Sequence, residues 1–216
     1  MIPFIIIQLI DFPIYFQLAA PGHLAAREGL RLEGTAMRLF FALDLPPAAK
    51  LKIDAWRDRS FRELSAGGIA RPVHPGNFHI TLAFIGDVDE RKLESLCDSV
   101  DQWLEQAPPA QGSLSLNQVG YWQRQGILWL GPEHCPDSLT QLAGRLQGLS
   151  RRTGGKCESK KFTPHVTLFR RCKVPPPSSL QPPEVRLDYA EFALFESSQG
   201  KQGVRYQALQ FWSCCP

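Results

Sequence analysis

The chain has 216 residues, of which 44% are hydrophobic and 21% charged, and its formal net charge is +3. These values are those of an ordinary globular protein and exclude a disordered chain, a collagen and a coiled coil. A chain of this length forms one domain or two small lobes and needs no cofactor or disulfide to fold. The six cysteines include no C-x-x-C pair, so we expect the reduced thiols of a cytoplasmic protein.

Residues 1–36 form an N-terminal extension whose first half is strongly apolar. A secretory signal needs a basic start and an unbroken apolar centre, but the first basic residue is Arg27, and Asp11 and Pro13 interrupt the run. We therefore expect residues 1–36 to lie upstream of the natural start, with a single two-lobed domain over residues 37–216. An ordered segment packed on the core and a membrane or export signal are the alternatives.

From Met37 onward, short apolar strands alternate with amphipathic helices. One helix is predicted from Pro46-Pro47 to about residue 64, a second carries Leu93 through Leu104, and a third covers about 136–152. We expect Gly86 to end the second strand and the proline-rich residues 175–183 to form a loop. The predicted strands cover residues 38–43, 78–85, 113–119, 127–131, 164–170, 186–195 and 205–212.

A strand-helix-strand unit occurs twice in this order. The first unit leads from Leu39 to a strand that holds His79, and the second leads from Ile127 to a strand that holds His165, over 40 and 38 residues. A two-copy repeat favours two similar lobes related by an approximate twofold axis. The sequence therefore predicts an α+β fold with two lobes.

Each repeat ends in a His-x-Thr strand, His79 to Thr81 and His165 to Thr167. Alternate side chains of a strand point to opposite faces, so each His and Thr share one face while their apolar neighbours fill a lobe core. With five His and six Thr in 216 residues, about 0.14 such matches are expected by chance. A structural histidine on each strand is the simpler alternative, but two matches at equivalent positions favour an acid–base pair in a shared cleft.

The positive charge is concentrated around the second motif. Residues 145–173 carry nine basic residues against the single acidic Glu158, which makes this segment +8 and the remainder −5. Such a segment favours an anionic polymer as partner. Arg170 is a phosphate-binding candidate, although it follows His165 by five residues and would face the other way unless the strand ends or bulges first. A solvated helix face is the alternative for Arg145, Arg151 and Arg152.

At these residues the chain resembles the two-histidine phosphoesterases, most closely the bacterial RNA 2′,3′-cyclic phosphodiesterase family, also called 2′-5′ RNA ligases. The resemblance covers about residues 37–213. It implies a bilobal fold of two antiparallel sheets flanked by helices, with the catalytic cleft between the lobes. The matching segments are Arg38-Leu39-Phe40-Phe41-Ala42-Leu43-Asp44-Leu45-Pro46, Arg71-Pro72, Asn77-Phe78-His79-Ile80-Thr81-Leu82-Ala83-Phe84-Ile85-Gly86, Leu128-Trp129-Leu130-Gly131, Pro164-His165-Val166-Thr167-Leu168-Phe169-Arg170, and Ser197-Ser198 ahead of Arg205-Tyr206.

The resemblance also implies an activity and its residues. The substrate would be RNA ending in a 2′,3′-cyclic phosphate, opened to a 2′-phosphomonoester, with possible reverse 2′-5′ ligation without ATP; DNA lacks the required 2′-hydroxyl. His79 and His165 would be catalytic, with His79 favoured as the acid and the assignment left open. The substrate-binding residues would be Thr81, Thr167 and Arg170 for the phosphate and Phe41 near the nucleotide.

We expect no cofactor and no metal, because the His and Cys residues show no zinc spacing. We also expect a monomer without a membrane or an obligate protein partner. The alternatives are a non-catalytic RNA-binding module that stacks bases on Tyr121 and Trp122, and a metal hydrolase built on His74, His79 and His165.

Overall fold

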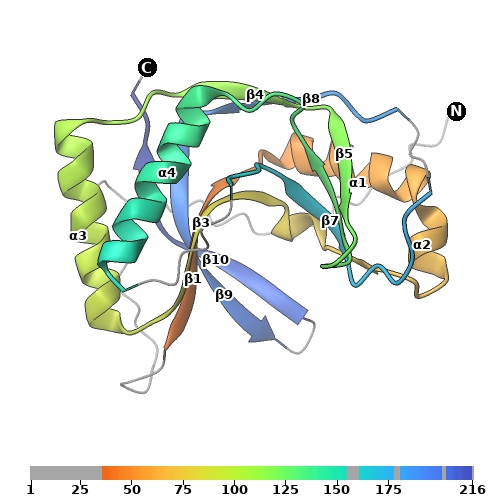
Figure 1. The fold of residues 1–216 in the computed structure, drawn as a ribbon, viewed down its shortest axis with the longest axis horizontal. Helices are drawn as coiled ribbons and strands as arrows, with labels where there is room; N and C mark the ends of the chain where they lie inside the picture. The colour runs from red at the N-terminus through yellow and green to blue at the C-terminus, as the bar shows by residue number, and fades with distance from the viewer. Residues whose placement is uncertain (1–35, 155–160, 178–180, 201–202, 216) are drawn as a thin grey trace, which may run out of the picture.

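The computed structural model describes residues 36–154, 161–177, 181–200 and 203–215. The predicted extension lies outside the described residues except for Ala36, so its role stays a prediction. Lys156, Cys157 and Lys160 lie outside them as well. The described part contains helices and antiparallel sheets in two layers that meet at an angle (Figure 1), as the α+β prediction requires.

Two four-stranded sheets form the two lobes. The first sheet has the order β10-β9-β1-β3, with β10 Gly203–Ser213, β9 Glu191–Gly200, β1 Met37–Asp44 and β3 His79–Val88. The second sheet has the order β2-β7-β6-β5, with β2 Arg71–Pro72, β7 Val166–Arg170, β6 Ile127–Gly131 and β5 Gln118–Trp122. Strands β4 Gly112–Leu116 and β8 Val185–Tyr189 form a separate antiparallel pair.

The helices pack beside both sheets and connect the two lobes. Helices α1 Pro47–Ser60 and α2 Arg62–Ala66 lie beside the second sheet, whereas α3 Glu90–Gln106 and α4 Asp137–Arg152 lie beside the first sheet (Figure 1). Helix α4 follows β6 of the second sheet but packs on β3 of the first. Because of this exchange, buried side chains of both lobes form one continuous core cluster.

Four predicted elements differ from the structure. The helix predicted to run to about residue 64 is divided at Phe61 into α1 and α2. The predicted strand 113–119 is divided into β4 and β5, which belong to different sheets, and the predicted strand 186–195 is divided into β8 and β9. Gly86 does not end its strand: with φ +89° it continues the pairing with β1 as far as Val88. The apolar pattern continues without interruption where each of the two divided strands passes from one sheet to another, so periodicity does not show the division.

Helix α3 starts where its sequence provides a cap. The carboxylate of Asp89 accepts a hydrogen bond from the backbone N–H of Lys92 at 2.9 Å, and this satisfies a donor that the first turn leaves unpaired. The five described cysteines are free thiols. None of the described helices is both long and apolar enough to cross a membrane.

Candidate active site

The two His-x-Thr strands face one cleft of about 410 Å³. His79 and Thr81 line it from β3, and His165 and Thr167 line it from β7. The intervening apolar side chains, such as Ile80, are buried in the core, which confirms the predicted alternation. The other lining residues are Leu82, Ala83, Phe84, Trp122, Gln125, Ile127, Gln147, Lys161, Phe162, Thr163 and Arg170.

A β-bulge in β7 brings Arg170 into the cleft. Trp129 of β6 pairs with Thr167 and the neighbouring Leu128 pairs with Phe169, so Leu168 is an extra residue without a partner in the ladder. Leu168 and Phe169 are therefore both buried, and the facing of the strand is reversed beyond them. We predicted that Arg170 would face the cleft only if the strand ended or bulged before it, and the bulge at Leu168 meets that condition.

The same bulge occurs at the equivalent place in β3. Phe41 of β1 pairs with Ala83 and Ala42 pairs with Thr81, so Leu82 is the extra residue, three positions after its histidine like Leu168. The residue five positions after His79 is consequently turned into the cleft. This residue is Phe84, whose side chain is 54% exposed. The two half-sites thus match at the His and Thr positions, but one presents an aromatic ring where the other presents a guanidinium.

Both imidazoles are held in the same tautomer. Nδ1 of His79 lies 2.8 Å from the carbonyl oxygen of Asn77, and Nδ1 of His165 lies 2.8 Å from that of Thr163. A carbonyl only accepts, so Nδ1–H donates in each ring and the lone pair of the neutral ring is on Nε2. The hydroxyl of Thr81 donates to Nε2 of His79 at 3.0 Å. Each neutral ring can therefore take up a proton at Nε2.

The environment of both rings favours the neutral form. Burial lowers the pKa of His79 to about 4, and the positive charges of Arg170 and Lys50 and the second histidine act in the same direction. Burial and the charge of Arg170 also lower the pKa of His165. The carbonyls at Nδ1 oppose these shifts in both rings. The cleft therefore holds two neutral imidazoles beside an arginine, an arrangement suited to an anion.

Aromatic rings hold each histidine in place. The His79 ring packs against Phe40 and Tyr206, each with a centroid distance of 4.9 Å. The His165 ring lies edge-on to Trp122 at 4.5 Å. Packed rings restrict the imidazoles to one orientation and exclude water from one side of each ring. Trp122 was predicted as an exposed stacking residue and lies at the cleft, whereas its neighbour Tyr121 packs against the core.

Phe41 is not at the cleft. Its side chain has no exposed surface and packs in the core against Phe192 and Trp212. This placement does not fit the predicted contact with a nucleotide, because strand alternation turns Phe41 away from the cleft and its neighbour Phe40 towards His79. The exposed ring available to a nucleotide is Phe84, which the sequence analysis missed because its direction depends on the bulge.

The basic segment is divided by the fold. Lys161 and Arg170 reach the cleft, whereas the guanidinium of Arg145 lies over the ring of Trp103, 5.7 Å from its centroid. His74 accepts a hydrogen bond from the backbone of Gly76 and is not among the residues that line the cleft. Within the residues that the structure describes, no cluster of three or more His, Cys, Asp or Glu side chains could hold a metal ion.

A family model described as LigT like Phosphoesterase matches residues 43–129 and again residues 130–206. The two matches together span more than half of the chain. The chain belongs to the LigT-like phosphoesterase family. Its two matched halves contain His79 and His165 respectively, so the family repeat coincides with the repeat of half-sites across the cleft.

The alignments of this phosphoesterase with its relatives cover nearly the whole length of each relative. The RNA 2′,3′-cyclic phosphodiesterase of Escherichia coli K12 is 35% identical over 181 residues, which are 82% of this chain and 96% of the relative. The protein of the same name from Thermotoga maritima is 26% identical over 181 residues, 80% of this chain and 93% of the relative. The crystal structure of E. coli LigT complexed with NADP+ has a TM-score of 0.73 and 32% identity and covers 84% of this chain and 99% of that chain. The similarity confirms the predicted fold.

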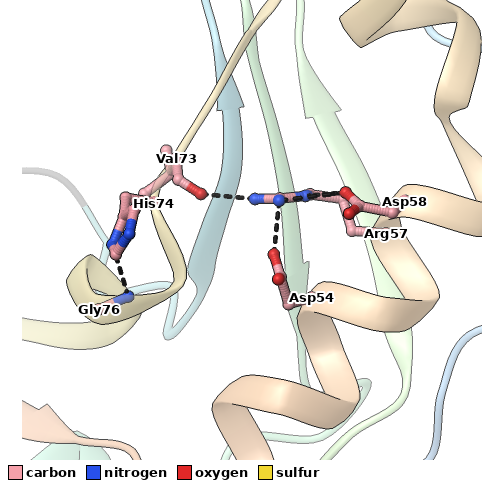
Figure 2. A network of polar contacts seen from close by, with 6 residues as sticks. All are labelled: Asp54, Arg57, Asp58, Val73, His74 and Gly76. Carbon is pink, nitrogen blue, oxygen red and sulfur yellow. Dashed lines mark hydrogen bonds and ion pairs between the residues drawn. The ribbon is translucent and has the colours of Figure 1, made fainter. Parts of the chain in front are cut away.

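The buried Arg57 is at the centre of a network of polar contacts (Figure 2). The side chain of Arg57 on α1 is 6% exposed, and its guanidinium donates hydrogen bonds to the carbonyl of Val73 and to the carboxylates of Asp54 and Asp58. The Cζ atom lies 5.5 Å from the ring centroids of both Phe78 and Phe169. These rings belong to the residues directly before His79 and Arg170, so one planar cation packs against the supports of both half-sites.

Proposed function

We propose that the protein hydrolyses 2′,3′-cyclic phosphate ends of RNA to 2′-phosphomonoesters with His79 and His165 as an acid–base pair. The observation that carries this proposal is the facing pair of His-x-Thr half-sites with Arg170 beside them in one cleft. The printed names of the relatives support the activity. The crystal structure of E. coli LigT complexed with phosphate supports a phosphate ligand for this fold.

The reaction needs one proton taken and one proton given. One imidazole takes a proton from water at Nε2 as the water oxygen forms a bond to phosphorus, and the other gives a proton to the ribose O3′ as the P–O3′ bond breaks. The product keeps its phosphate on O2′. We favour His79 as the acid and His165 as the base.

Binding of the phosphate favours protonation of the proposed acid. Burial and the charge of Arg170 lower the pKa of both histidines, so both rings are neutral near pH 7. The negative charge of a bound phosphate opposes both effects and favours an imidazolium. The proposed acid is therefore protonated in the substrate complex, and it returns to the neutral form when the product leaves.

The negative charge that develops on the phosphate is stabilised by hydrogen-bond donors held in place around it. The hydroxyls of Thr81 and Thr167 would donate to the non-bridging oxygens, and the guanidinium of Arg170 would form a charge-assisted bond to them. Phe84 offers an exposed ring on the opposite half-site, where the terminal base can stack. The same chemistry allows a ligation: when an RNA 5′-hydroxyl replaces water, a 2′-5′ bond forms as P–O3′ breaks.

The test is the incubation of the full chain with 2′,3′-cyclic AMP and EDTA, with the products resolved as 2′- or 3′-AMP. We expect 2′-AMP, no effect of EDTA, and no turnover by the variant with both His79→Ala and His165→Ala. His134→Ala, a histidine outside the cleft lining, is the matched control. Turnover by the double variant would refute the proposal, binding without turnover would favour an RNA-binding module, and loss of activity with EDTA would favour a metal hydrolase.

We also propose that the protein works as a cytoplasmic monomer without a metal. The free thiols of the described cysteines support a reducing compartment. Two imidazoles and an arginine can carry out the proposed step without a further charge. Sedimentation of the purified protein tests the monomer, and a dimer at assay concentration would contradict it.

A further inference from the structure

A second arginine stands beside Arg170 on the same face of the second sheet. In the antiparallel pairing of β2 with β7, Arg71 is the direct partner of Arg170. Side chains of directly opposite residues lie on the same face, with Cβ atoms about 4.5–5.5 Å apart. Because Arg170 lines the cleft, the side chain of Arg71 starts from the cleft face at its edge.

This pairing of two arginines is unfavourable in itself. Like charges directly opposite each other destabilise a strand pair. Among the described residues, no carboxylate forms an ion pair with Arg71 or Arg170. Arg71 is exposed as well, so neither burial nor a salt bridge explains its position. Anions bound at the two guanidinium groups would offset the repulsion.

The guanidinium of Arg71 also lies against the start of β10. A Cβ atom added at Gly203 would lie 2.9 Å from Nη2 of Arg71. The neighbouring Val204 accepts a hydrogen bond at 2.9 Å from the side chain of Asn77, two residues before His79. Arg71 therefore lies where the second sheet, the β9–β10 hairpin and the chain leading into β3 meet, at the end of the cleft next to Arg170.

We propose that Arg71 binds the phosphodiester on the 5′ side of the cyclic end, so that the two arginines hold two successive phosphates of an RNA strand. This inference rests on the proposed function and extends it from a cyclic nucleotide to a polynucleotide. Neighbouring strands lie about 4.8 Å apart, and long arginine side chains that diverge from them can reach two neighbouring phosphates. A planar guanidinium suits a phosphate because it donates two parallel hydrogen bonds.

The experiment compares substrates with and without the second phosphate. Wild type and Arg71→Gln are assayed with 2′,3′-cyclic AMP, which has no internal phosphodiester, and with the dinucleotide ApA 2′,3′-cyclic phosphate, which has one. We expect Arg71→Gln to lower kcat/KM for the dinucleotide about 10-fold and to leave kcat/KM for 2′,3′-cyclic AMP unchanged. With a cyclic-ended oligoadenylate, the slope of log kcat/KM against log salt should become shallower by about 0.7–1.

The control is Arg186→Gln, because Arg186 is an exposed arginine of β8 outside the cleft lining. Arg71→Lys keeps the charge and should retain most of the salt slope. Equal loss on both substrates would overturn the inference, since Arg71 would then act on the same phosphate as Arg170. No loss on either substrate would overturn it as well. Failure of wild type to open 2′,3′-cyclic AMP would instead refute the proposed function.

Discussion

Replacing Arg57 by Met should damage both stability and turnover, because the guanidinium supports both half-sites. The bond to the Val73 carbonyl is charge-assisted and contributes about 1.5–3 kcal/mol. Asp58 is 62% exposed and adds at most about 1 kcal/mol, but Asp54 is only 25% exposed and would lose its partner. The two rings at 5.5 Å add about 0.5–2 kcal/mol each.

These contributions overlap and a Met side chain restores part of the packing, so we expect a loss of about 3 kcal/mol, at the lower limit for breaking a buried ion pair. For a domain of this size such a loss lowers Tm by about 6–12 °C. A shift of about 1 Å between His79 and Arg170 is enough to lower kcat about 100-fold. Thermal unfolding and steady-state kinetics at 20 °C, well below the lowered Tm, measure the two effects separately.

Two further variants decide the interpretation. Arg57→Lys keeps the charge but loses the flat, forked guanidinium, so it should recover part of the stability and little of the turnover. Arg59→Met, an exposed arginine of the same helix, should change neither. If Arg57→Met lowers Tm but keeps the wild-type kcat at 20 °C, the arginine stabilises the fold without positioning the half-sites, and our reasoning is wrong.

Four other predictions follow from the site. Replacing His79 or His165 by Ala should lower kcat about 10²–10⁴-fold without unfolding the protein, as steady-state assays and circular dichroism would show. The pKa of His79 is 6.5 in the unfolded chain and about 4 in the folded protein, so the neutral ring's contribution to stability is complete above pH 6.5 and is lost as the pH falls towards 4. Urea unfolding at a series of pH values should show a loss of up to about 3 kcal/mol over this range. The variant His79→Asn should not show this loss. The apparent pKa values in kcat should exceed those in kcat/KM, because bound phosphate favours the imidazolium; coincident profiles would contradict this. Gly120→Ala should lower both kcat and Tm, because the added Cβ would lie 2.0 Å from the Trp129 ring, which packs beside His165. The control Gly144→Ala, whose added Cβ would have no atom within 4 Å, should lower neither kcat nor Tm.

The sequence predicts the parts of this fold that local patterns determine. The repeat of His-x-Thr strands and the buried stripe of α3 follow from periodicity, and the structure agrees with both. The direction of Arg170 and Phe84 depends on the extra residues Leu168 and Leu82, which are defined only by pairing with another strand. Apolar composition alone does not show where a ladder skips a residue.

The role of Arg57 was missed for a related reason. An arginine on a predicted amphipathic helix is normally solvated, and no local signal indicates that two phenylalanines from distant strands enclose it. Arg71-Pro72 is part of the family resemblance, but its two-residue strand is too short for periodicity to indicate which way Arg71 faces. Long-range contacts of this kind determine how the half-sites are held, and they are absent from any window of the sequence.

The equivalent bulges turn different side chains into the two halves of the cleft, so the cleft is not symmetric. Two half-sites related by a twofold axis would accept a symmetric group equally well in either orientation. Here the fifth residue after each histidine differs, a ring at Phe84 and a cation at Arg170, so the two orientations of a bound nucleotide are no longer equivalent. Exchanging these two side chains should therefore reverse which histidine faces the leaving group, with the backbone of both strands unchanged.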